Sequence, residues 1–62
     1  MFWIRQFVTD FIRPGSYRLS PPIVTREAAD AAFLAPLPRG NTRELWMIRD
    51  DGTPVLLTAR IA

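Results

Sequence analysis

The sequence contains no cysteine, no histidine and no lysine. The absence of cysteine excludes disulfides, thiol nucleophiles and thiolate metal ligands. The absence of histidine removes the commonest general base and metal ligand, and leaves no imidazole to activate a serine or threonine. We therefore expect no metal site and no cofactor.

Glycine and carboxylates are also scarce. The three glycines stand at positions 15, 40 and 52, too far apart to form a phosphate-binding loop. Of the six carboxylates, only Asp50 and Asp51 are adjacent, and they precede Gly52 in a segment typical of a turn. A carboxylate pair that performs acid–base chemistry needs a cleft that tunes its pKa values. We expect no catalytic residues and no enzyme activity.

Long hydrophobic runs are missing as well. No apolar stretch approaches the ~18 residues of a membrane span, so we expect none. The first twelve residues carry Arg5 and Asp10 within their apolar pattern, and no small-residue cleavage site follows, which argues against a secretory signal. We expect a soluble, cytoplasmic protein.

The chain has 62 residues, which predicts a single small domain over residues 1–62. A chain of this size buries only about 60% of its unfolded surface. With no disulfide or metal to stabilise it, the fold requires tight packing or a protein partner, as a homodimer or a hetero-complex. All eight basic residues are arginine, which suits contacts to phosphate. The net charge is only +2, however, because six acidic residues are interspersed, so nucleic acid is the less favoured partner.

The N-terminal segment, residues 2–12, is predicted to form an amphipathic helix. Apolar residues recur four positions apart and form one broad stripe, with polar residues opposite. Strand alternation is the competing interpretation, but it would separate Trp3 from Phe2 and Ile4. The stripe consists of Trp3, Phe7, Phe11, Ile4, Val8 and Ile12.

The middle of the chain predicts a short strand and a second short helix. Residues 16–20 suit a strand, and two prolines stiffen the link that follows. The helix is expected from Arg26 to about Ala35, with Thr25 as its N-cap and Pro36 at its end.

Residues 44–61 predict a β-hairpin, because two β-prone runs flank the dipeptide Asp51-Gly52. A two-residue loop is the preferred register and a three-residue loop with a bulge is the rival. The preferred register opposes Arg43 and Arg60, which destabilises a strand pair unless an anion or carboxylate lies between them. It also predicts one apolar face as core: Trp46, Ile48, Val55, Leu57, Ala59 and Ile61.

The expected fold class is α+β, with an N-terminal amphipathic helix, a second short helix, and a C-terminal hairpin forming a two- or three-stranded antiparallel sheet. The other hairpin face mixes arginines with apolar residues, and arginine and methionine are enriched in protein interfaces. The alternative is that the N-terminal helix covers this face as core. The predicted partner-binding residues are Arg43, Leu45, Met47, Arg49, Leu56 and Arg60.

The predicted function is a small noncatalytic protein-binding module that acts as an inhibitor or adaptor. Its size and helix-plus-hairpin plan are similar to small phage or mobile-element inhibitors, anti-CRISPR proteins among them, an analogy of plan rather than of a site. The alternatives are a small nucleic-acid-binding regulator and a structural subunit of a larger assembly.

Overall fold

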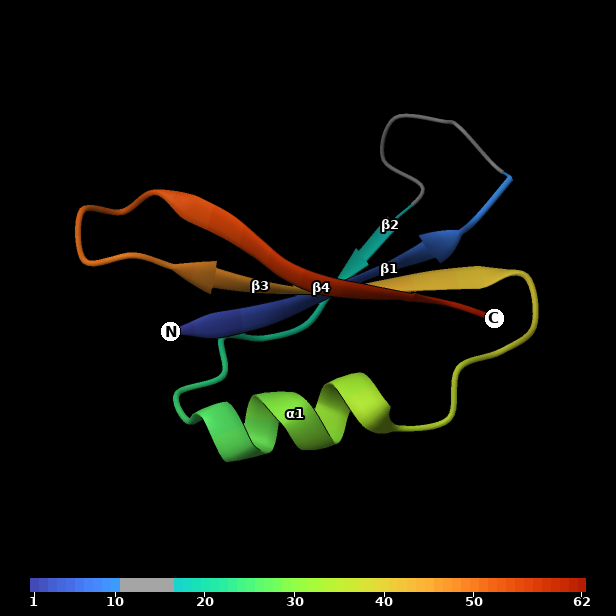
Figure 1. Cartoon of the computed structure of the whole chain (residues 1–62), viewed down its shortest axis with the longest axis horizontal. Coiled ribbons are helices and arrows are strands. Elements are labelled where there is room, and N and C mark those ends of the chain that lie inside the picture. Colours follow the sequence, from blue (N-terminus) through green and yellow to red (C-terminus); the bar gives the residue numbers. More distant parts are fainter. Residues whose placement is uncertain (11–16) are drawn as a thin grey trace.

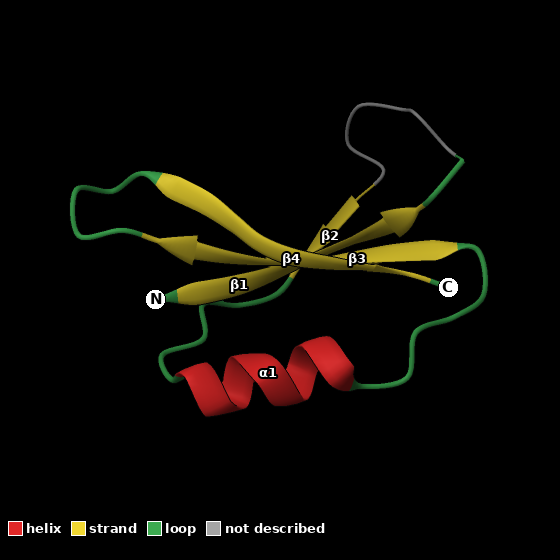
Figure 2. Cartoon of the chain, in the orientation of Figure 1, coloured by secondary structure: helices red, strands yellow, loops and turns green. Residues whose placement is uncertain are grey.

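A four-stranded antiparallel sheet with a helix on one face makes up the fold (Figures 1 and 2). The computed structural model describes residues 1–10 and 17–62. The strand order is β2-β1-β3-β4, so β1 and β3 are central and β2 and β4 form the edges. The elements are β1 (Phe2–Val8), β2 (Tyr17–Leu19), α1 (Arg26–Leu34), β3 (Asn41–Ile48) and β4 (Pro54–Ile61).

The N-terminal segment forms a strand, so the prediction of an N-terminal helix is wrong. β1 pairs with β2 on one side and with β3 on the other, as in the register Ile4↔Leu45. Its apolar residues satisfy both a helical stripe and a strand that has packed side chains on both faces. Pairing with a distant strand decides between the two. The predicted helical residues 11 and 12 lie outside the described residues.

The sheet is larger than expected, and it contains the predicted short strand as β2. The prediction of a two- or three-stranded sheet accompanied by two helices is therefore wrong. In the described part of the chain, α1 is the single helix. Within the described residues, no helix has the length and apolar character needed to cross a membrane.

The helix α1 matches the predicted second helix closely. Thr25 is its N-cap, because the Thr25 hydroxyl accepts a hydrogen bond from the amide of Ala28 at 3.2 Å. One side of α1 packs on the sheet through Ala29 and Phe33, one turn apart. The buried hydrophobic core consists of Ile4, Ala29, Phe33 and Leu45, with Phe2, Ile23, Ala32 and Leu57 packed against it.

The hairpin between β3 and β4 closes with a three-residue loop, so the preferred two-residue loop is wrong. Arg49 donates its amide hydrogen bond to the Thr53 carbonyl and accepts one from the Gly52 amide at 2.8 Å. Gly52 has a φ of +86°, a conformation that glycine adopts without strain. The rival register therefore holds next to the turn, as in the pair Met47↔Val55.

A bulge in β4 then changes the register. Trp46 pairs with Leu56 and Leu45 pairs with Thr58, so Leu57 is the extra residue. Beyond the bulge the pairs are those of the two-residue prediction, including Arg43↔Arg60. The opposition of two arginines is therefore confirmed.

The carbonyl groups at the C-terminal end of α1 accommodate both arginines. The Arg43 guanidinium donates to four carbonyls, including Ala35 at 2.6 Å, and the Arg60 guanidinium donates to Phe33 at 2.6 Å. The last carbonyls of a helix lack partners within it and carry partial negative charge. Burial and the charge of Arg60 lower the pKa of Arg43 from its ordinary value. The helix end thus supplies the negative charge that the pair requires.

Candidate functional site

The sheet face opposite α1 is called here the open face, because within the described residues no helix covers it (Figure 1). Side chains alternate between the two faces of a strand, and directly paired residues share a face. The register therefore assigns its members from all four strands. They are Trp3, Arg5, Phe7, Tyr17, Leu19, Thr42, Glu44, Trp46, Ile48, Pro54, Leu56, Ala59 and Ile61.

Aromatic side chains dominate the two central strands of the open face. Trp3 and Trp46 are directly paired across β1 and β3. Their rings are nearly parallel, with centroids 5.7 Å apart and planes 7° apart. Such cross-strand aromatic pairs stabilise a sheet. The pair therefore presents a rigid apolar surface rather than two independent side chains.

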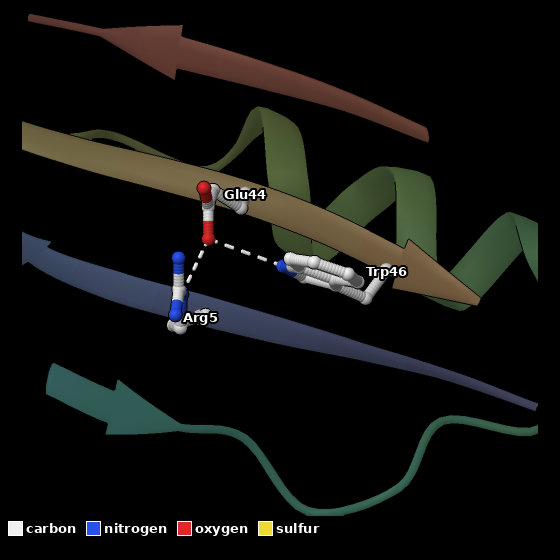
Figure 3. Close-up of polar contacts among 3 residues, drawn as sticks. All are labelled: Arg5, Glu44 and Trp46. Atoms are coloured by element: carbon white, nitrogen blue, oxygen red, sulfur yellow. Dashed lines mark hydrogen bonds and ion pairs between the residues drawn. The ribbon is translucent and has the colours of Figure 1, made fainter. Parts of the chain in front are cut away.

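The Arg5–Glu44 ion pair lies beside Trp46, one member of this stack (Figure 3). The Glu44 carboxylate accepts one hydrogen bond from Nε of Arg5 and another from the indole Nε1 of Trp46 at 3.1 Å. The Arg5 guanidinium also lies over the rings of Phe7, Tyr17 and Trp46, at 5.3, 5.7 and 5.7 Å from their centres. Each charged group on this face is thus held by several contacts.

These contacts shift the protonation equilibria of the pair. Burial on its own raises the pKa of Glu44, but the hydrogen bonds from Arg5 and Trp46, together with the charge of Arg5, lower it below its ordinary value. The hydrogen bond to Glu44 raises the pKa of Arg5. Both groups are therefore charged near neutral pH, and the pair is electrically neutral overall.

Acid is expected to remove the stabilisation that Glu44 provides. Because the folded-state pKa of Glu44 lies below the unfolded value of about 4.3, its contribution is present above that pH. It is lost as pH falls from about 4.3 through the folded pKa. Urea unfolding of the wild type and of Glu44→Gln, followed from neutral to acidic pH, measures the difference in free energy. If the difference in unfolding free energy between the wild type and Glu44→Gln does not change with pH, the lowered pKa of Glu44 in the folded state is contradicted.

The margins of the open face are apolar and exposed. Tyr17 is 47% exposed, Leu19 56%, Leu56 45% and Ile61 74%. At one end the face is hollowed by a shallow apolar depression of about 300 Å³, whose lining includes Met1, Trp3, Leu19 and Ile48. The depression is large enough to receive an apolar side chain from another molecule.

The structure does not bring the six predicted partner-binding residues together. Arg43, Leu45, Met47 and Arg60 lie on the face covered by α1, where Leu45 is fully buried. Arg49 is exposed at the turn, and only Leu56 belongs to the open face. The predicted core residues Trp46, Ile48, Ala59 and Ile61 lie on the open face instead. The alternative, that the N-terminal helix covers this face, is wrong because residues 2–8 form β1; Leu45 is buried beneath α1 instead.

Sequence reasoning missed the aromatic and charged residues of β1. Trp3, Arg5 and Phe7 lie on one face of β1, but apolar residues also occupy the other face, so the segment lacks the strict apolar–polar alternation that indicates a strand. The same residues also fit a helical stripe, which is why the pattern predicts a helix there. Interpreted as a strand, residues 2–8 would have placed Trp3 and Phe7 on one face.

Among residues 1–10 and 17–62, no three His, Cys, Asp or Glu side chains are grouped closely enough to hold a metal ion. Comparison of the chain with protein-family models, with curated proteins and with solved structures found no match.

Proposed function

We propose that this chain is a noncatalytic protein-binding module whose binding surface is the open face. The observation that carries the proposal is an ordered aromatic and apolar surface on the side of the sheet away from α1. Exposed apolar patches of this kind mark interaction sites in small proteins. Trp, Tyr and Arg, which occur together here as Trp3, Tyr17 and Arg5, are the residue types enriched at interface hot spots.

The charges of the open face favour a protein partner. Among the described residues that the register places on this face, Arg5 and Glu44 are the charged side chains, and they pair with each other. Glu44 is already only 9% exposed, so covering the face removes little additional water from its carboxylate. An unpaired charge would carry a large desolvation cost on burial, whereas this pair carries much less.

The same features disfavour nucleic acid. Phosphate binding depends on cations that are free to replace counterions, but Arg5 is committed to Glu44. Base stacking needs accessible ring faces, yet Trp3 and Trp46 stack on each other and Arg5 lies over three rings. A base would have to displace these contacts before it could stack.

The four-stranded sheet removes the analogy with phage inhibitors. That analogy depended on a helix-plus-hairpin plan, and the sheet has four strands. Protein binding is supported by the residues of the open face; inhibition of a particular target is not.

A matched pair of leucine substitutions tests the proposal. Leu19 lies on the open face beside the apolar depression, and Leu34 lies on α1 with 67% exposure. Leu19→Arg would place an unpaired charge in the interface, and Leu34→Arg would add the same charge elsewhere. We expect affinity purification from the native host to recover one stoichiometric protein with the wild type and with Leu34→Arg. Recovery with Leu19→Arg should fall about tenfold or more, since tenfold corresponds to only 1.4 kcal/mol.

Both variants should unfold at the same urea concentration as the wild type, because both leucines are exposed. Undiminished recovery with Leu19→Arg would refute binding through the open face. Recovery that depends on nuclease-sensitive material would support the nucleic-acid alternative.

A further inference from the structure

The two edges of the sheet differ in length and in protection. β2 contributes three residues, and Pro21-Pro22 follows it closely. β4 contributes eight residues at the opposite edge. An edge strand exposes a row of unpaired N–H and C=O groups, and proteins usually block such a row with charges, prolines or a covering segment. β4 is therefore the edge at which another strand could add.

Backbone hydrogen bonds identify the outward-pointing groups of β4. Ala62 donates its amide to the Asn41 carbonyl at 3.0 Å, and its carbonyl accepts from the Gly40 amide at 2.9 Å, so both groups point toward β3. In an antiparallel strand, successive residues point to alternate sides. Arg60 therefore also points toward β3, whereas Ala59 and Ile61 direct their N–H and C=O groups away from the sheet.

The half of β4 after the bulge lacks the usual protection. Arg60 is the only charged residue of β4. Its guanidinium is held by the Phe33 and Ala35 carbonyls of the helix end, so it does not guard the edge. Pro54 stands at the far end of the strand, and the bulge at Leu57 disturbs the ladder between the two halves. The unguarded segment is thus residues 58–61.

We propose that a second copy of this chain pairs antiparallel with this segment, with the twofold axis at Ala59. In this register Arg60 stands opposite Thr58 of the second copy. The neighbouring register, centred on Arg60, would place two arginines directly opposite each other, which is destabilising. Pairing of β4 with the β2 edge of another copy joins two different edges, so it leaves one free edge on each copy and does not by itself give a closed dimer.

The dimer has a continuous eight-stranded sheet with both copies of α1 on one side. The two open faces lie on the other side and meet along β4, where Leu56 and Ile61 are exposed. Covering this margin reduces the exposed apolar surface of each copy. The dimer does not depend on the proposed function, because the edge uses backbone groups and the open face uses side chains.

Two measurements on the 62-residue wild type, light scattering and amide hydrogen exchange, test the dimer together. We expect the mass measured by light scattering to rise from one chain to two between low micromolar and near-millimolar concentration. By NMR, exchange at the Ala59 amide should slow over the same range, because Ala59 lies opposite Ala59 of the second copy; Ile61 lies opposite the bulge residue Leu57 and is not expected to gain a bond. The Arg60 amide, bonded within the sheet, should be protected throughout and serves as the internal control. A single-chain mass at every concentration would refute the proposal, as would exchange of the Ala59 amide at a rate that does not depend on concentration.

Two substitutions at one position supply an independent test. Ala59→Pro removes an outward N–H without removing a bond to β3, and Ala59→Val keeps that N–H. We expect Ala59→Pro to be monomeric and Ala59→Val to remain dimeric. A dimeric, folded Ala59→Pro would show that the copies meet elsewhere, and if this variant does not fold, the exchange measurement decides. Leu19→Arg, which tests the open face, should leave the dimer unchanged.

Discussion

Leu45→Ala is expected to lower the free energy of unfolding by about 2–5 kcal/mol. Leu45 is the largest fully buried side chain of the described core, and it lies on β3 beneath α1. The substitution removes the apolar contacts of its side chain and leaves a cavity that a four-residue core has few ways to fill. Because the total stability of a 62-residue chain is on the order of 3–9 kcal/mol, the substitution should remove a large share of it and lower the urea midpoint accordingly.

Urea denaturation followed by tryptophan fluorescence measures this loss. Leu34→Ala is the matched control, since Leu34 is 67% exposed on α1 and its truncation should change stability by no more than about 0.5 kcal/mol. Equal effects of the two substitutions would contradict the assignment of the helix-covered face as the core.

Arg43→Met is expected to destabilise the fold by about 2–3 kcal/mol. Arg43 is 7% exposed, and its guanidinium donates to the Ala32, Phe33, Ala35 and Pro36 carbonyls and to the Gln6 side chain. Methionine keeps most of the apolar volume but leaves buried acceptors without donors, at about 1–3 kcal/mol for each one left unsatisfied. Two effects reduce the total: Arg60 still donates to Phe33 and Ala35, and its repulsion with Arg43 disappears.

Two further arginine substitutions separate the contributions. Arg43→Lys keeps the charge but loses the planar fork that reaches several carbonyls, so its effect should lie between wild type and Arg43→Met. Arg49→Met removes an exposed turn arginine and should change stability by no more than about 0.5 kcal/mol. If urea unfolding gives the same small loss for Arg43→Met as for Arg49→Met, the helix-end contacts contribute little to stability.

The N-terminal segment shows why local patterns were insufficient. Residues 2–8 contain apolar residues at positions that fit both a helical stripe and a doubly packed strand, and the segment has no local signal that excludes either. β1 becomes a strand because β3, about forty positions later in the chain, supplies its hydrogen-bond partners, as in Trp3↔Trp46. A non-local pairing of this kind has no counterpart in a window of neighbouring residues.

The assignment of the two hairpin faces failed for a related reason. A shift of one residue in register exchanges the faces of a strand. The three-residue loop and the bulge at Leu57 produce two registers within one hairpin, so neither single-register prediction describes its whole length. The arginines are predicted at a binding surface because arginine and methionine are enriched in protein interfaces, but the carbonyls at the end of α1 make the interior suitable for Arg43.

The sequence by itself determined the features that depend on neighbouring residues. These are the presence of a hairpin turn that includes Gly52, though not its length, the helix that follows the Thr25 cap, and the exclusion of chemistry that requires cysteine or histidine. Tertiary structure alone decided that residues 2–8 form a strand, that Leu45 is core, and that Trp3, Arg5 and Trp46 share an open face. The physical reason is that turns and caps are stabilised by hydrogen bonds within a few residues. Whether a segment forms a strand, and which of its faces is buried, is decided only when segments distant in the chain pair.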